Sequence, residues 1–232
     1  METTRDRLVP GTPMWTITLD REANDAACLF SHGLAATSRI RHDYHDAVAA
    51  MSLLALGAEK MLKLTIGIQR VCLTGVWPSK NYMRRIGHRV ERADRRARLL
   101  LDGNRGEAHG YVQELMAKVD ADLTIAEVLK VLDRFGNEGR FYFLDALGEE
   151  PQTQTAPHFL WGGLMSSLIK VNPGLGSRMA DPQDWKQARP LLNQMVVTSL
   201  ASWWEFYRAV WTTGVIGDDA KQYSQTLKLT HG

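Results

Sequence analysis

Apolar residues recur at spacings of three and four along most of this chain, and this periodicity constrains the fold more than any other feature. The longest run is HDAVAAMSLLALGAEKMLKLTIGIQRVCL, at 45–73. Its main stripe consists of Val48, Met51, Leu54 or Ala55, Ala58, Leu62, Thr65 or Ile66, and Gln69. Leucine, isoleucine and valine widen the stripe on both sides. A helix with so broad an apolar surface belongs at the centre of a bundle, so 47–73 is predicted to be deeply buried.

A second long apolar helix is predicted over 183–211. Its apolar positions recur every three or four residues, at Leu192, Val196, Leu200, Trp203, Tyr207 and Trp211. Glu205 and Arg208 lie within it, and charges in a membrane span carry a large free-energy cost, so we expect burial in protein. The tryptophans are expected in the core or in dimer packing. The apolar width exceeds what one neighbouring helix covers, which favours a homodimer.

The fold class predicted from these patterns is all-α, a bundle of about six or seven helices. WTITL at 15–19 is the one stretch that also fits a short strand. We expect an extended N-terminal arm over 1–19, a helical core over 20–150 that opens with Asp20 as its N-cap, and C-terminal helices over 151–232 packed on that core. Within the core, Thr124 and Glu127 have the spacing of a capping box.

Composition and short motifs give no indication of a membrane protein or of a bound cofactor. The net charge is +2, so any affinity for a polyanion must come from local clusters. The N-terminal segment lacks an apolar signal-peptide core. Cys28 and Cys72 stand apart in apolar stretches, which is typical of reduced thiols in a cytoplasmic protein. NPGLG at 172–176 lacks the pattern of a phosphate loop, and no cofactor is expected.

The segment MRRIGHRVERADRRARLLL, at 83–101, is rich in arginine. On one continuous helix, Arg85, Arg89, Arg92 and Arg96 fall on a single stripe. Such a stripe forms either a surface for RNA phosphates or a solvated face with local ion pairs. A phosphate-binding edge is expected near Arg85 and His88, where amides at a helix N-terminus would add hydrogen-bond donors.

Three local patterns, in their order along the chain, resemble those of HEPN-domain proteins, including the abortive-infection branch. They are Glu59 followed by Lys63 in AEKMLKLTI, GHRV at 87–90, where a loop leads into a helix, and the turn GRFYFLD at 139–145, which contains Arg140. The resemblance covers residues 20–150. It implies a helical core in which Glu59, Lys63, His88 and Arg140 contribute to a functional site.

Many HEPN proteins are metal-independent ribonucleases, and the resemblance therefore implies RNA binding or cleavage, in stress or phage defence. Their motif is an arginine, four to six residues and then a histidine, with two copies meeting across a dimer. Arg39 and His45 have that spacing but precede Glu59, whereas His88 is better placed but follows Arg84 and Arg85 too closely. Some HEPN proteins are non-catalytic, so the alternative is an interaction module that dimerises through its helices.

Several candidate residues also have simpler interpretations. Glu59 and Lys63 form either a surface pair or a polar pair facing a cleft. His88 is either the histidine of the HEPN pattern or a residue that packs locally at a helix start. RHDYHD at 41–46 places His42, His45 and Asp46 on one helical face, which is a weak candidate for a divalent metal.

Overall fold

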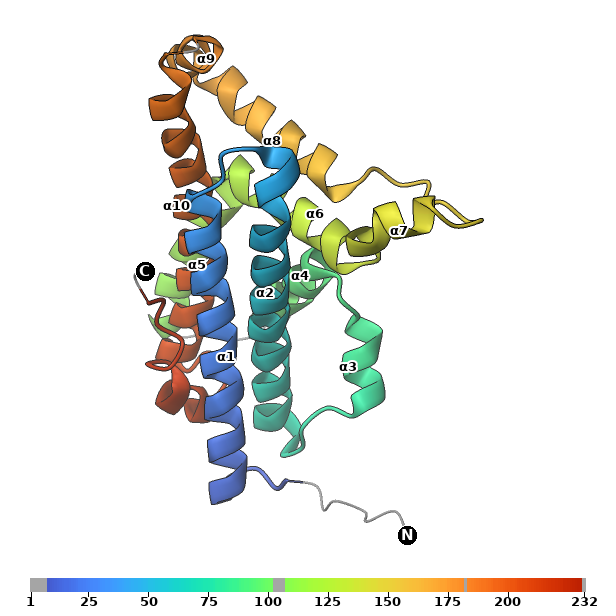
Figure 1. Ribbon diagram of the computed structural model, residues 1–232. Coiled ribbons are helices and arrows are strands. Elements are labelled where there is room, and N and C mark those ends of the chain that lie inside the picture. The colour runs from blue at the N-terminus through green and yellow to red at the C-terminus, as the bar shows by residue number, and fades with distance from the viewer. Residues whose placement is uncertain (1–7, 102–106, 182, 231–232) are drawn as a thin grey trace.

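The computed structural model describes residues 8–101, 107–181 and 183–230, and every regular element in them is a helix (Figure 1). The α-helices are α1 (Pro13–Ser38), α2 (Asp43–Thr74), α3 (Lys80–Ile86), α4 (Val90–Leu99), α5 (Glu107–Ala121), α6 (Leu123–Gly136), α7 (Tyr142–Ala146), α8 (Pro157–Val171), α9 (Pro173–Ala180) and α10 (Trp185–Thr213). Two 3-10 helices are η1 (Gly139–Phe141) and η2 (Asp218–Tyr223). The all-α class is confirmed. The expected six or seven helices is too few, because short helices such as α7 and α9 give no long periodic pattern.

Two helices begin earlier than their sequences predicted. The N-cap of α1 is Thr12, whose hydroxyl accepts a hydrogen bond from the amide of Trp15, and Pro13 follows at the first helical position. Asp20 is therefore inside α1, the stretch 15–19 that also fitted a strand is helical, and the expected extended arm is wrong from residue 13 onward. Residues 1–7 of that arm lie outside the described residues. The N-cap of α6 is likewise Asp122 and not Thr124.

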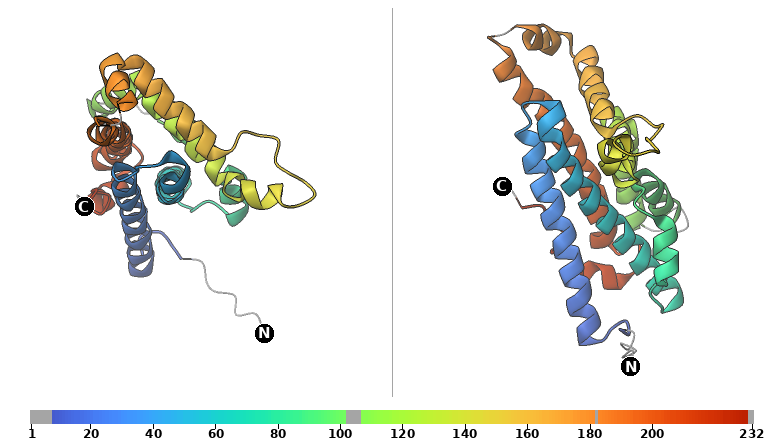
Figure 2. Two further views of the ribbon diagram at one scale, coloured as in Figure 1. Left: turned by 45° about the horizontal axis from the view of Figure 1, so that its top comes forward. Right: turned by 45° about the vertical axis from the view of Figure 1, so that its right-hand side comes forward.

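Helices α1 and α2 pack together at very short range along their length (Figure 2). A Cβ atom at Gly57 would lie 2.8 Å from the backbone nitrogen of Phe30, and one at Gly33 would lie 2.7 Å from the Leu54 side chain. Real Cβ atoms essentially never approach other atoms so closely, so the two glycines permit this packing. The α1–α2 pair forms one side of the core.

The prediction that α2 and α10 are among the most buried elements is confirmed. Trp203 and Trp204 are fully buried, and both stack on Phe30 of α1. The indole nitrogen of Trp211 donates to the Thr65 hydroxyl of α2 at 2.9 Å. Helices α1, α5, α6, α8 and α9, together with η2, also contact α10. The width of α10 is thus covered within one chain, so apolar width no longer supports the predicted homodimer, which then depends on the HEPN resemblance alone.

The arginine-rich segment is not one helix. Gly87 has φ +73° and ψ −152°, a conformation that only glycine adopts readily, and it separates α3 from α4. Arg85 therefore lies on α3, Arg89 is the N-cap of α4, and only Arg92 and Arg96 share one helical stripe. The predicted four-arginine stripe is wrong.

A buried polar network joins the C-terminal helices to the start of α2. The carboxylate of Asp43 accepts hydrogen bonds from the indole of Trp161 on α8, at 3.1 Å, and from the guanidinium of Arg189 on α10, at 2.9 Å for Nη1. Arg189 also contacts Asn193, whose amide donates to the Ile40 carbonyl at 2.7 Å. These bonds fix the α1–α2 turn against α8 and α10. Among the described helices, none combines the length and apolar character that crossing a membrane requires.

Candidate functional site

Three candidate residues that are distant in the sequence meet where α3 gives way to α4. The Nδ1 atom of His88 lies 3.0 Å from Oε2 and 3.1 Å from Oε1 of Glu59, and the ammonium of Lys63 lies 2.6 Å from Oε1. We call Glu59, Lys63 and His88 the Glu59–His88 cluster. The Glu59 side chain is 13% exposed and that of His88 is 56% exposed. The carboxylate is thus shielded while the imidazole faces solvent.

Two glycines place His88 against α2. The positive φ of Gly87 turns the chain out of α3, so that His88 precedes α4 instead of continuing α3. A Cβ atom at Gly136 of α6 would clash with the His88 carbonyl oxygen, so α6 approaches this turn only because residue 136 is glycine. The backbones of α3, α4 and α6 therefore fix the position of the imidazole.

The geometry assigns distinct roles to the two imidazole nitrogens. In a neutral ring whose Nδ1–H donates to the Glu59 carboxylate, Nε2 carries a lone pair. No hydrogen-bond partner for Nε2 is present among the described residues. A carboxylate that orients a histidine and stabilises its protonated form is the arrangement that general-base catalysis uses. Lys63 balances the charge of Glu59. Glu59 contacts both Lys63 and His88, so the interpretation of Glu59 and Lys63 as a polar pair agrees with the structure better than a surface pair does.

The arginines around this turn fall into two groups. Arg89 contacts the Asp133 carboxylate of α6 at 3.4 Å, and Arg96 donates to the Tyr82 hydroxyl at 2.8 Å. By contrast, no carboxylate oxygen of the described residues lies within 4.0 Å of the cationic groups of Arg84, Arg85 or Arg92. All three are exposed. Local contacts therefore occupy Arg89 and Arg96, whereas Arg84, Arg85 and Arg92 form an exposed cationic surface.

The amides at the start of α4 do not form the expected anion site. Asp133 accepts a hydrogen bond from the Glu91 amide at 3.0 Å and thereby caps α4 from α6. A phosphate at this turn would meet an acidic side chain where free amides were predicted. Anion binding here must rely on the exposed guanidinium groups.

Arg39 and His45 do not join the cluster. His45 is in the first turn of α2, fourteen residues before Glu59, which is about 21 Å along a helix axis. Its ring contacts Tyr44 edge-on, with centroids 5.4 Å apart. Arg39 follows the end of α1 and is exposed at a different surface. The pair with the HEPN motif spacing, Arg39 and His45, thus lies apart from the Glu59–His88 cluster.

No metal site forms at the described histidines of the α1–α2 turn. Oδ2 of Asp46 accepts the amides of Arg41 and His42 at 2.8 and 2.9 Å. These bonds, first that of His42 and then that of Arg41, lower the pKa of Asp46. No group of three histidine, cysteine or acidic side chains suited to a metal occurs in the part of the chain that the structure describes. Asp46 instead stabilises the turn and the first amides of α2.

Arg140 also lies apart from the cluster. Its guanidinium is 4.9 Å above the Phe141 ring, on η1, and none of its described contacts involves Glu59, Lys63 or His88. The buried arginine nearby is Arg134 of α6, which donates to the Thr155 carbonyl at 2.9 Å and to the Asn137 carbonyl at 3.1 Å. Arg134 holds the loop before α8, a role that no local sequence pattern indicated.

An apolar pocket adjoins the cluster through Lys63. Its volume is about 420 Å³, and it lies between α1, α2 and the segment around α3. Trp15 and Trp77 form an edge-to-face pair in its wall, with centroids 5.3 Å apart. The pocket is within the size range of small-molecule sites. Sequence reasoning missed it because its residues come from three separate segments.

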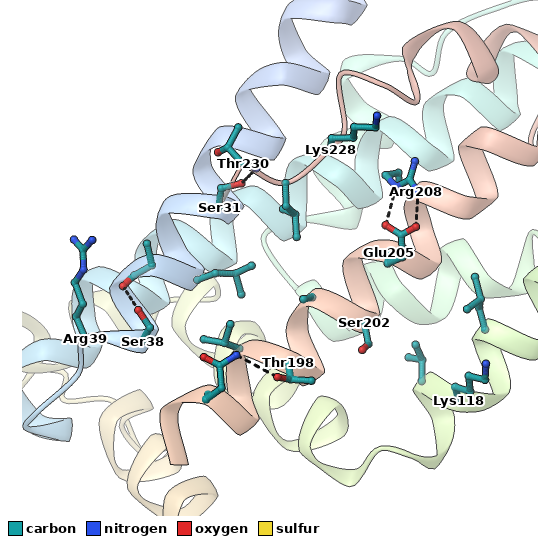
Figure 3. A pocket seen from close by; sticks show the side chains of 18 residues that line it. Ser31, Ser38, Arg39, Lys118, Thr198, Ser202, Glu205, Arg208, Lys228 and Thr230 are labelled. Atoms are coloured by element: carbon teal, nitrogen blue, oxygen red, sulfur yellow. Dashed lines mark hydrogen bonds and ion pairs between the residues drawn. The ribbon is translucent and has the colours of Figure 1, made fainter. Parts of the chain in front are cut away.

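A larger groove, which the sequence also did not predict, lies between α1, α5, α10 and residues 228–230 (Figure 3). Its volume is about 890 Å³. Arg39 lies at one end of the groove, whereas Lys118 and Lys228 lie toward the other. It is thus separate from the Glu59–His88 cluster.

Comparisons of this chain with protein-family models, with curated proteins and with solved structures gave no match.

Proposed function

We propose that this chain is a HEPN-like RNA-binding protein that cleaves RNA without a metal ion. The contact of His88 with Glu59, at 3.0 Å, is the observation that supports this most strongly. It joins two of the three patterns on which the HEPN resemblance rests, although they are separated by 29 positions. The same resemblance is the basis for proposing a role in stress response or phage defence.

The proposed reaction uses the 2′-hydroxyl of RNA as the nucleophile. Nε2 of His88 removes the hydroxyl proton, and the oxygen attacks the adjacent phosphorus while the bond from phosphorus to the 5′-oxygen breaks. His88 then returns the proton to the departing 5′-oxygen, which leaves a 2′,3′-cyclic phosphate and a 5′-hydroxyl end. Glu59 orients the imidazole and stabilises its cationic form between the two proton transfers.

Arg84, Arg85 and Arg92 are proposed to hold the RNA backbone. Their guanidinium groups are exposed and have no acidic partner within 4.0 Å among the described residues. Guanidinium groups bind phosphate oxygens through paired hydrogen bonds, and they attract RNA through counterion release. Arg89 contributes less, because Asp133 already contacts it.

Catalysis is tested with labelled single-stranded RNA in EDTA. His88→Ala should lower the cleavage rate by about 10²–10⁴-fold, as expected for loss of a general base. His45→Ala is the matched control, since it removes another exposed histidine that lies about 21 Å away along α2. Glu59→Gln should give an intermediate rate. Equal rates for wild type and His88→Ala, or equal losses in both histidine variants, would contradict the proposal.

Binding is tested separately, with RNA that carries 2′-deoxy sugars and therefore cannot react. Replacing Arg85 and Arg92 with alanine should weaken binding and flatten the slope of log K against log salt by about one unit for each phosphate that is no longer neutralised. Arg21→Ala with Arg70→Ala removes two exposed arginines elsewhere and should leave the slope unchanged. An unchanged slope in the Arg85/Arg92 variant would exclude this surface as the RNA site.

A further inference from the structure

The large groove combines an apolar floor with a cationic rim. Leu34, Leu115, Val119, Val197 and Leu229 supply most of the apolar lining, which we call the floor, and polar side chains such as Thr198 and Ser202 also line the groove. Four cationic side chains line the groove against a single carboxylate, Glu205, and that carboxylate is paired with Arg208 at 2.7 Å. The uncompensated cations are Arg39, Lys118 and Lys228, which have no acidic partner within 4.0 Å among the described residues.

The lining of the groove offers no surface on which a base would stack. It contains no aromatic ring, whereas single-strand binding sites generally use such rings. The chemistry instead fits an occupant that carries both apolar and acidic side chains.

The chain itself presents such a segment at residues 138–150, which we call the arm. Four of its apolar side chains are strongly exposed: Phe141 at 45%, Phe143 at 51%, Leu144 at 66% and Leu147 at 86%. Four acidic residues accompany a single arginine, and they are Glu138, Asp145, Glu149 and Glu150. Exposed apolar residues gathered on one short segment mark an interaction surface.

The arm does not reach the groove of its own chain. It follows α6 on the side of the molecule away from α1 and α10 (Figure 1 and the left view of Figure 2). The groove is on the side formed by α1, α5 and α10. Any contact between them must therefore join two copies.

We propose that the arm of one copy docks in the groove of a second copy. Leu144 and Leu147 lie on the apolar floor, and Glu149 and Glu150 face Lys118 and Lys228. Because the two surfaces differ and lie on opposite sides, the contact is head-to-tail, and each added copy leaves one arm and one groove free unless a ring closes. This inference is independent of the proposed RNA chemistry.

The test uses charge reversal on each surface. By light scattering, the wild-type mass should rise with protein concentration at low salt and fall toward the monomer at high salt. Glu149→Lys with Glu150→Lys, and separately Lys118→Glu with Lys228→Glu, should each weaken self-association on the order of a hundredfold, because like charges then face each other. Mixing the two variants in equal amounts should restore association, because each arm then meets a groove of opposite charge.

Arg21→Glu with Arg70→Glu is the control, since it changes the net charge by the same amount at exposed positions outside the groove. This control should associate like the wild type. A wild-type protein that stays monomeric at about 100 µM, where a contact of ordinary weak affinity is populated, would overturn the proposal. Failure of the mixed variants to associate would also overturn it, as would RNA binding that is abolished only in the Lys118/Lys228 variant.

Discussion

Removal of the Asp94 carboxylate should be among the most destabilising single changes in this protein. The Asp94 side chain is buried on α4, where Oδ1 accepts hydrogen bonds from the Trp203 indole at 2.7 Å and the Tyr207 hydroxyl at 2.8 Å. Oδ2 accepts from Nε of Arg98 at 2.6 Å. Burial, and next the Asp94 charge, raise the pKa of Tyr207 well above 10.0, so its hydroxyl stays a donor near neutral pH.

The magnitude follows from what Asp94→Ala leaves behind. The change deprives Arg98, whose side chain is 16% exposed, of its buried partner. It leaves the buried indole of Trp203 without its acceptor, and the Tyr207 hydroxyl keeps only the Asp94 backbone carbonyl, at 3.4 Å. Breaking a buried ion pair from one side costs about 3–5 kcal/mol. In a domain of this size, about 4 kcal/mol corresponds to a melting temperature lower by roughly 8–16 °C. Asp94→Asn should cost about half as much, because an amide oxygen can still accept from Trp203 and Tyr207.

The assay is thermal and urea unfolding of matched variants. Asp120→Ala is the control, because Asp120 also contacts Arg98 at 2.6 Å, yet its side chain is 62% exposed. That substitution should cost less than about 1 kcal/mol. Asp94→Ala combined with Tyr207→Phe should cost less than the sum of the single changes, since both remove the same hydrogen bond. An Asp94→Ala cost no larger than that of Asp120→Ala would refute the reasoning.

Two further predictions concern close packing and acid stability. Gly57→Ala should destabilise the α1–α2 pair by about 1–3 kcal/mol in urea unfolding, whereas Gly163→Ala, with open space around it on α8, should stabilise by about 0.5–1 kcal/mol; equal effects would contradict the close approach. Burial lowers the pKa of His158 below 6.5, so the unfolded chain binds the proton more readily, and stability should fall as the pH drops below 6.5. In urea unfolding at about pH 7.5 and about pH 5.5, His158→Phe should reduce that loss, and an equal loss in both proteins would exclude His158 as its source.

The long helices were predictable because their buried faces recur with the helical period. In α2 and α10 the pattern extends over many turns, and tertiary packing reinforces it. The resemblance indicated a helix start at 87–90, but periodicity did not indicate the break at Gly87, because Ile86, Val90, Ala93 and Ala97 are buried at spacings that also suit one continuous helix. Apolar spacing reports which face is buried, and it does not report the φ angle of a glycine between two such positions.

The contacts of the candidate site could be predicted from the sequence only in part. The order of the HEPN-like patterns pointed to Glu59, Lys63 and His88, but periodicity alone gives no reason for residue 88 to meet residue 59. The groove was beyond reach, since Arg39, Lys118 and Lys228 come from three segments that only the tertiary fold brings together. Arg39 was singled out for its spacing to His45, and it instead lines this groove.

The small net charge of +2 conceals a separation of charge over the surface. Among the described residues, cations without an acidic partner gather at the α3–α4 turn and around the groove, whereas the arm carries four acids and one arginine. The two cationic surfaces differ in the groups beside the cations, because Glu59 and His88 lie at the turn, whereas the groove also has leucine and valine in its lining. The charge of a surface determines the charge of the partner that it binds, and an apolar lining requires that the partner also carry apolar groups. This difference in lining is why we propose different partners for the two surfaces, a phosphate at the turn and an acidic, apolar segment at the groove.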